Sequence, residues 1–226
     1  MPAIERVIID PEAWSRMLLY VDCCETEIGG LGIGVAKGLE FHLEEVILIK
    51  QWVTANDVLL ANEGLATFLH EFVDAGGDPS KIKVWWHSHV HHPLRWSKQD
   101  EETIRLLNQD YLISLVGDKS GSWLCRLDKV GPPATSREPI PIEVSDRGGV
   151  PDAVEPALRE EIQREIDEKV TVWELVQLPG QGGYFFGTEV VTSDYSIALE
   201  SYGSFLLPWE SGGEESGPSS TPEAET

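Results

Sequence analysis

The chain has few cysteines and no long apolar run. Its three cysteines, Cys23, Cys24 and Cys125, are an odd number with two adjacent members, so they form neither a disulfide framework nor a CxxC zinc knuckle. No apolar run approaches the roughly 18 residues that a membrane-spanning helix needs. The N-terminal residues lack the basic segment and apolar core of a signal peptide. We therefore expect a cytoplasmic protein.

Positive charge is also scarce. Lys and Arg number 17 against 39 Asp and Glu, which gives a formal net charge of −22. A protein that binds nucleic acid or an anionic membrane needs a basic surface to neutralise phosphates. We therefore expect no nucleic-acid partner and no membrane partner. A basic protein or peptide partner is compatible with this charge, although solubility alone also accounts for it.

The pattern of apolar residues and turn formers divides the chain into four parts. Alternating helices and strands over 1–130 predict one α/β or α+β domain with a mixed sheet. Residues 131–150 are rich in Pro and Gly, which indicates a linker. A C-terminal extension over 151–209 contains an apolar stripe that predicts an amphipathic helix over 152–170. The acidic tail over 210–226 lacks large apolar residues, and we expect it to be disordered.

Local signals predict the elements of the first domain. Asp10 followed by Pro11 is typical of a helix start, because Asp caps the helix and Pro fits its first position. The further elements expected are a glycine-rich strand over 27–35, one or two strands within 39–54, a helix over 57–75, a strand over 81–87, a helix over 98–108, and a hairpin of strands over 111–117 and 122–130.

Four of the six histidines lie between residues 87 and 92. His87 and His89 end a predicted strand, where residues two apart point to the same face. Asp100 lies three residues after Ser97, the predicted helix cap, and a helix N-terminus favours an ionised carboxylate. Two His and one carboxylate, with water in the fourth position, are typical of an open catalytic zinc site. We therefore predict that His87, His89 and Asp100 bind Zn²⁺.

A hydrolytic metal site also needs a general base, and Glu27 is the candidate. It begins the glycine-rich strand, whose small residues would let that strand approach the strand over 81–87 closely. Glu25, two residues earlier, is the alternative. His91 and His92 are expected to be solvated loop residues, because three protein ligands already suffice for such a site.

Two other patterns predict less. The run GGLGIG lacks the final glycine of GxGxxG and does not follow a strand in a βαβ unit, so it does not indicate a dinucleotide site. The adjacent Cys23 and Cys24 have no accompanying motif of a thiol nucleophile.

The residues Glu27-Ile-Gly-Gly-Leu-Gly-Ile-Gly and His87-Ser-His89-x7-Ser97-x2-Asp100 together resemble the JAMM motif of the MPN+ (JAB domain) zinc metalloproteases. The resemblance covers about residues 5–130. It implies a cytidine-deaminase-like JAB/MPN sandwich, in which a curved mixed β-sheet is flanked by helices. It implies that His87, His89 and Asp100 ligate zinc and that Glu27 transfers the proton. It also implies that the Ser97 hydroxyl stabilises the oxyanion.

Members of this family cleave amide bonds at the C-terminus of ubiquitin or ubiquitin-like proteins. The resemblance therefore implies a deubiquitinase-like isopeptidase or peptidase that deconjugates or processes a ubiquitin-like protein. The length of the chain resembles prokaryotic or phage members, which implies E1-like activating and E2-like conjugating enzymes as pathway partners. Many members carry Pro directly after the second His, whereas this chain has Val90 and a loop over 90–96 rich in His, Arg and aromatic residues. The difference bears on the choice of substrate.

Two functional alternatives stay open. The chain can be a metal-dependent hydrolase of another peptide or small amide. It can also be an MPN interaction module that is inactive alone or depends on a partner. At the level of single residues, Ser97 and Asp100 also fit a helix capping box, and Ser97 can serve as cap and as oxyanion donor together.

Overall fold

The computed structural model describes residues 2–53, 58–91, 93–108, 110–130, 136–145, 155–172, 174–177 and 184–187. The chain divides into two compact units, Met1–Thr188 and Glu189–Thr226, and all of the described residues lie in the first. The tail expected to be disordered, 210–226, lies outside the described residues.

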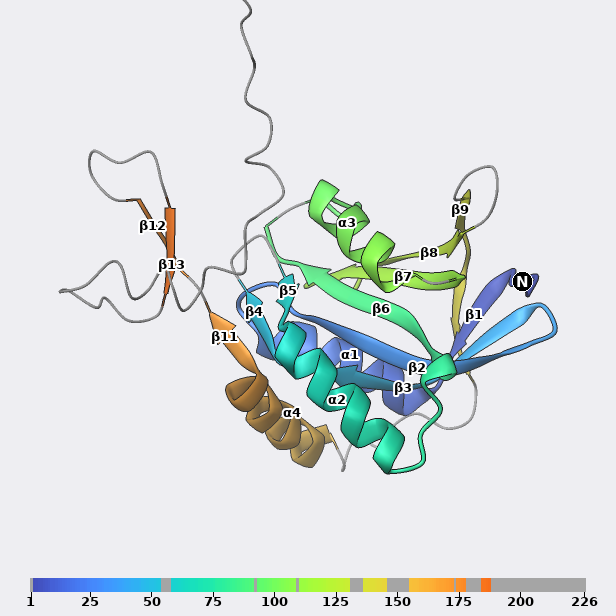
Figure 1. Ribbon diagram of the computed structural model, residues 1–226, viewed down its shortest axis with the longest axis horizontal. Coiled ribbons are helices and arrows are strands. Elements are labelled where there is room, and N and C mark those ends of the chain that lie inside the picture. The colour runs from blue at the N-terminus through green and yellow to red at the C-terminus, as the bar shows by residue number, and fades with distance from the viewer. Residues whose placement is uncertain are drawn as a thin grey trace, which may run out of the picture. The chain divides into compact units, whose positions relative to one another are not determined.

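An eight-stranded mixed sheet forms the centre of the fold (Figure 1), with the strand order β10-β1-β3-β2-β6-β7-β8-β9. The strands are β1 (Arg6–Ile9), β2 (Gly29–Lys37), β3 (Glu40–Leu48), β6 (Ile82–His89), β7 (Tyr111–Asp118), β8 (Trp123–Lys129), β9 (Ser136–Pro139) and β10 (Ile142–Val144). β6 runs antiparallel to β2 and parallel to β7, and β7 and β8 form the expected hairpin. The mixed sheet predicted from the sequence is confirmed.

Four α-helices accompany this sheet in the described part of the chain. They are α1 (Pro11–Cys23), α2 (Asn62–Asp74), α3 (Lys98–Leu107) and α4 (Glu155–Lys169), and a 3₁₀ turn, η1, spans Pro79–Lys81. Short strands β4 (Gln51–Val53), β5 (Val58–Leu60) and β11 (Val170–Val172) form a second sheet, and β12 (Glu174–Gln177) pairs with β13 (Tyr184–Gly187). None of the described helices has the length and apolar character needed to span a membrane.

The two faces of the large sheet bury separate apolar clusters. Successive side chains of β6 point to opposite faces of the sheet. Trp86 packs in the cluster that includes α1 and α4, whereas Trp85 packs in the cluster that includes α2 and α3. In Figure 1, α2 lies in front of the sheet and α1 behind it. The described part of the protein therefore has a mixed α/β fold, in which helices cover both faces of a curled sheet.

The helix starts follow the expected chemistry. The side chain of Asp10 accepts the backbone N–H of Glu12, and Pro11 occupies the first turn of α1. The helix expected over 57–75 begins only at Asn62, because residues 58–60 instead pair with β4 as strand β5. An apolar run of three residues fits a strand as well as a helical stripe, so the sequence alone did not separate them.

The prediction of a linker over 131–150 is wrong for residues 136–139 and 142–144, which form strands. Residues 136–139 and 142–144 are β9 and β10, the two outermost strands of the large sheet. Proline cannot donate to a strand ladder, but an edge strand tolerates it because one side of that strand has no partner. A proline-rich composition therefore fits an edge strand as well as a linker. Residues 131–135 and 146–150 lie outside the described residues.

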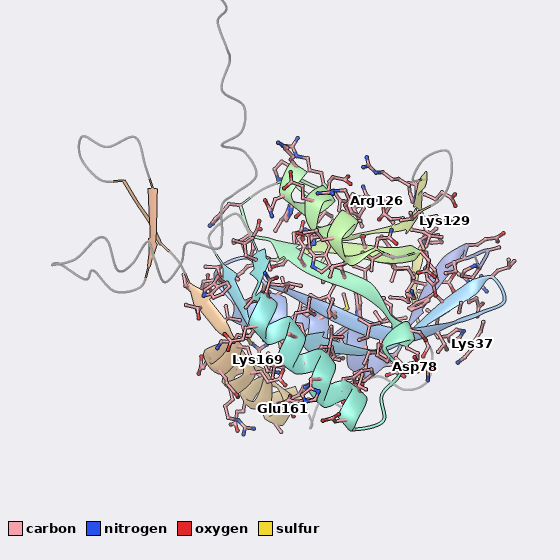
Figure 2. The ribbon with its side chains drawn as sticks, in the orientation of Figure 1. Lys37, Asp78, Arg126, Lys129, Glu161 and Lys169 are labelled. Atoms are coloured by element: carbon pink, nitrogen blue, oxygen red, sulfur yellow. The ribbon has the colours of Figure 1, made fainter. Side chains whose placement is uncertain are left out.

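The amphipathic helix expected over 152–170 is present as α4, over Glu155–Lys169. Its stripe of Leu158, Ile162 and Ile166 is buried in the same apolar cluster as α1. Arg16 of α1 donates to Glu161 at 2.6 Å, and Figure 2 shows Glu161 and Lys169 on α4. The stripe therefore belongs to the core of the domain and is not an open docking face.

Replacing Ile162 by Ala tests this packing. Ile162 is fully buried, so Ile162→Ala should lower the free energy of unfolding by about 2–5 kcal/mol through lost contacts and a cavity. Urea unfolding followed by circular dichroism measures the change. The exposed Glu160→Ala on the same helix should stay within about 0.5 kcal/mol of the wild type. Equal stabilities of the two variants would mean that α4 does not dock on α1.

Candidate metal centre

β6 carries both histidines of the predicted site. The strand extends to His89, two residues further than expected, and so includes His87 and His89 on the face that α3 covers. The two side chains are 1% and 3% exposed, respectively. Trp85 stacks on His87 with their ring centroids 4.2 Å apart, which holds the imidazole in place.

The first turn of α3 brings Asp100 to the histidines. Ser97 is the N-cap, and its hydroxyl accepts the backbone N–H of Asp100 at 3.1 Å. In return, Asp100 Oδ2 accepts the backbone N–H of Ser97 at 2.5 Å, which completes a capping box. The predicted helix start and the capping role of Ser97 are confirmed. The cap fixes the Asp100 carboxylate, which is buried at 7% exposure.

The three side chains form a compact group of nitrogen and oxygen donors. The Nε2 atoms of His87 and His89 are 3.2 Å apart. Asp100 Oδ1 lies 3.3 Å from His87 Nε2, and Oδ2 lies 3.5 Å from His89 Nε2. A tetrahedral ion with bonds of about 2.0–2.1 Å separates its ligand atoms by about 3.3 Å, so these separations fit one shared ion. The buried group can therefore bind a metal ion.

The protonation states of two of these side chains suit a cation. Burial lowers the pKa of His87, which favours the neutral imidazole that a metal requires. Burial alone would raise the pKa of Asp100, but hydrogen bonds from His87 and His89 outweigh it, so its pKa is lowered and the carboxylate is ionised.

His89 differs from His87 in its surroundings. Burial lowers its pKa, but hydrogen bonds to Asp100 and to the Pro93 carbonyl, together with the charge of Glu27, raise it overall. Its Nδ1 lies 3.1 Å from the Pro93 carbonyl oxygen, which can only accept. Nδ1 therefore donates there, and Nε2 is directed toward His87 and Asp100 as a potential ligand atom.

The structure places Glu27, rather than Glu25, next to the histidines. The residue after Glu27, Ile28, exchanges hydrogen bonds with Ser88, which lies between the two histidines in sequence. Glu27 is 2% exposed, and its charge contributes to the raised pKa of His89. The side chain of Glu25 is instead 90% exposed and pairs with Lys119 at 3.2 Å.

Close approach of β2 to β6 depends on glycine. Gly29 pairs with His87, and a Cβ atom at position 29 would lie 2.8 Å from the Trp86 carbonyl oxygen and 3.0 Å from the His87 Cβ. Any larger residue there would push the two strands apart. The glycines of β2 therefore fulfil the expected role of allowing this approach.

Sequence reasoning did not identify Gln51, which contacts the strand next to the histidines. Its side chain is 1% exposed, accepts the Gly29 N–H at 3.0 Å and donates to the Gly29 carbonyl at 2.7 Å. The amide thus takes the place of a neighbouring strand at the point where β3 has ended. No signal in the sequence marks such a contact between a side chain and a distant backbone.

The candidate metal-binding group does not include the other residues considered from the sequence that the structure describes. His91 is exposed, as expected for a loop residue, and His92 lies outside the described residues. Cys23, Cys24 and Cys125 are free thiols. Within the described part of the chain, the group of metal-binding side chains contains no cysteine.

The likeness of this chain to known proteins is structural. No family model and no curated protein matches the chain. Among solved structures, the chain is similar to protein DSY2949 from Desulfitobacterium hafniense, whose structure was determined in solution. The two share 18% sequence identity with a TM-score of 0.46, over 62% of this chain and 94% of that chain.

Metal-induced stabilisation tests the centre directly. A divalent ion at about 100 times its Kd should raise the free energy of unfolding of the wild type by about 2.7 kcal/mol. Asp100→Asn removes the charged ligand while its amide oxygen can still accept the Ser97 N–H, so this variant should lose most of the gain. Glu102→Gln on the same helix should keep it. Thermal unfolding with and without Zn²⁺ or Co²⁺ measures the effect, and an undiminished gain in Asp100→Asn would contradict the assignment.

Proposed function

We propose that this chain is a zinc-dependent peptidase or isopeptidase of the JAMM/MPN+ (JAB domain) type. Its substrate would be the amide bond at the C-terminus of a ubiquitin-like protein. The observation that carries the proposal is the buried group of His87, His89 and Asp100 with donor atoms 3.2–3.5 Å apart. Glu27, which lies two residues before the adjacent strand β2, would supply the acid–base group that such a hydrolase needs.

The donor set favours zinc among divalent ions. Two imidazoles and one carboxylate are common protein ligands of catalytic zinc, and the three leave a fourth position for water or substrate. Hard ions such as Mg²⁺ and Ca²⁺ instead prefer oxygen donors. When bound, zinc would supply a Lewis acid that activates water near neutral pH and polarises the substrate carbonyl.

The chain's own residues would perform the proton transfer and stabilise the charge. Glu27 would accept a proton from the attacking water and deliver it to the leaving amine. Ser97 Oγ accepts the Asp100 N–H, and a hydroxyl that accepts still has its own hydrogen to donate. That hydrogen would stabilise the oxyanion that develops on the substrate carbonyl.

The architecture is compatible with the family assignment. A mixed sheet with helices on both faces is compatible with a cytidine-deaminase-like JAB/MPN sandwich. In this proposal a ubiquitin-like protein is the substrate, and E1-like and E2-like enzymes of the same pathway are its partners. In this proposal the loop over 90–96, which departs from the family pattern at Val90, would contribute to substrate choice.

Glu27→Gln tests the proton-transfer role. Loss of the carboxylate should lower kcat by about 10²–10⁴-fold on a ubiquitin-like protein fused through its C-terminus to a reporter, because general acid–base catalysis contributes about that much. Zinc content should stay at the wild-type level. Glu25→Gln, two residues away, should leave kcat unchanged.

Two results would contradict this assignment. Wild-type kcat in Glu27→Gln would exclude Glu27 as the base. Zinc binding without cleavage of any ubiquitin-like fusion, but with cleavage of short peptides, would favour a metal-dependent hydrolase of other amides.

Ser97→Gly separates the capping role of Ser97 from its proposed role toward the oxyanion. Replacing a serine cap by glycine lowers the free energy of unfolding by only roughly a few tenths of a kcal/mol. Glycine, however, has no hydroxyl to donate to an oxyanion. We expect near-normal thermal stability and a kcat lowered by about 10²–10³-fold. Ser97→Thr, which keeps both the cap and the hydroxyl, should retain most of the activity. If Ser97→Gly keeps wild-type kcat, Ser97 is a helix cap only.

A further inference from the structure

Helix α3 has few buried apolar side chains that could fix its position on the sheet. Only two of its residues are buried, Asp100 and Ile104, and one of these is the charged group of the candidate metal centre. Leu107 is partly buried, whereas Leu106 is 76% exposed. A helix with so few buried apolar side chains can shift or rotate on the sheet, and a shift would move the Asp100 carboxylate relative to the histidines of β6.

Arg126 of β8 contacts both sides of the Ser97–Asp100 capping box. Its guanidinium donates to Glu101, which follows Asp100, through Nη1 to Oε1 at 2.8 Å and Nη2 to Oε2 at 3.1 Å. The same guanidinium lies over the ring of Trp96, which precedes Ser97, at 4.4 Å from the centroid. One buried cation therefore holds the residues immediately before and after the turn that presents Asp100 (Figure 2 labels Arg126).

Arg126 is itself held in place by the sheet. Its Nε donates to Asp128 on the same strand at 3.1 Å, and Asp128 accepts the Ser114 hydroxyl of β7 at 3.0 Å. Arg126 is 7% exposed, and Asp128 and Ser114 are fully buried. The strands β7 and β8 thus fix the guanidinium, and the guanidinium fixes the first turn of α3.

We infer that Arg126 and Glu101 are positioning residues of the metal centre. Through its contacts with Glu101 and Trp96, the guanidinium fixes the position of Asp100. It thereby fixes the distances from the Asp100 carboxylate to the imidazoles of His87 and His89. Neither residue touches the ion or the reacting atoms. The inference rests on the metal centre and extends it from three ligands to the contacts that orient one of them.

Metal affinity measures this positioning without any assay of catalysis. Arg126→Lys keeps the charge but cannot form the two parallel hydrogen bonds or the same stacking on Trp96. Glu101→Gln keeps the shape but loses the charge. Both variants should bind Co²⁺ about tenfold more weakly or worse and change its visible absorption spectrum, as substitutions behind metal ligands commonly do. Competition with a chelating dye gives the Kd for Co²⁺ in the full-length chain.

Lys129→Met is the matched control. Lys129 lies on the same strand as Arg126, and both are labelled in Figure 2, but it pairs with Glu138 of β9 at 2.9 Å and not with α3. The Lys129→Met variant should bind Co²⁺ with the affinity of the wild type, even if its free energy of unfolding falls. Arg126→Lys combined with Glu101→Gln should weaken binding by less than the two single effects added together, because both substitutions disrupt the Arg126–Glu101 ion pair.

The outcomes separate this inference from the proposed function. Wild-type Co²⁺ affinity and spectrum in both single variants would overturn the positioning role and leave the metal centre intact. No Co²⁺ binding by the wild type would overturn both. If Arg126→Lys fails to fold, as circular dichroism shows, Glu101→Gln decides, since the Glu101 side chain is 27% exposed and its loss is milder.

Discussion

β2 and β6 lie side by side because glycine occupies the positions where their backbones come closest. A Cβ at Gly29 would lie 2.8 Å from the Trp86 carbonyl oxygen of β6, and one at Gly32 would lie 2.8 Å from the Val84 Cβ. Antiparallel pairing places Gly29 opposite His87, and Ile28 exchanges hydrogen bonds with Ser88, so the chain brings Glu27 next to the histidines. The candidate base and two candidate ligands thereby meet at one end of two strands, although they are 60 residues apart in the sequence. Every other feature of the centre is added to this pairing.

The helix contributes the remaining ligand through a different physical effect. The capping box fixes the carboxylate of Asp100, and the ionised form is favoured at a helix N-terminus. Strand β6 holds its two candidate ligands by backbone pairing, whereas a polar network that leads from Ser114 through Asp128 and Arg126 to Glu101 helps to hold α3. The centre therefore combines a rigid half on β6 with a half whose position depends on buried charge.

Local chemistry explains which features could be predicted from the sequence. Strand alternation placed His87 and His89 on one face, and the cap at Ser97 placed Asp100, because both depend on neighbouring residues. Edge strands β9 and β10 were interpreted as a linker, since proline suits both. Gln51 and Arg126 were missed because each acts on backbone or side chains more than twenty residues away. Contacts of that kind depend on the order of the strands in the sheet, which neighbouring residues in the sequence do not determine.

The central claim is that His87, His89 and Asp100 hold one metal ion. X-ray absorption spectroscopy of the zinc-loaded chain identifies the ligands directly. The account predicts two imidazole nitrogens and further oxygen donors at about 2.0–2.2 Å. A sulfur ligand at about 2.3 Å, which would have to come from a cysteine, or a spectrum without imidazole scattering would contradict it.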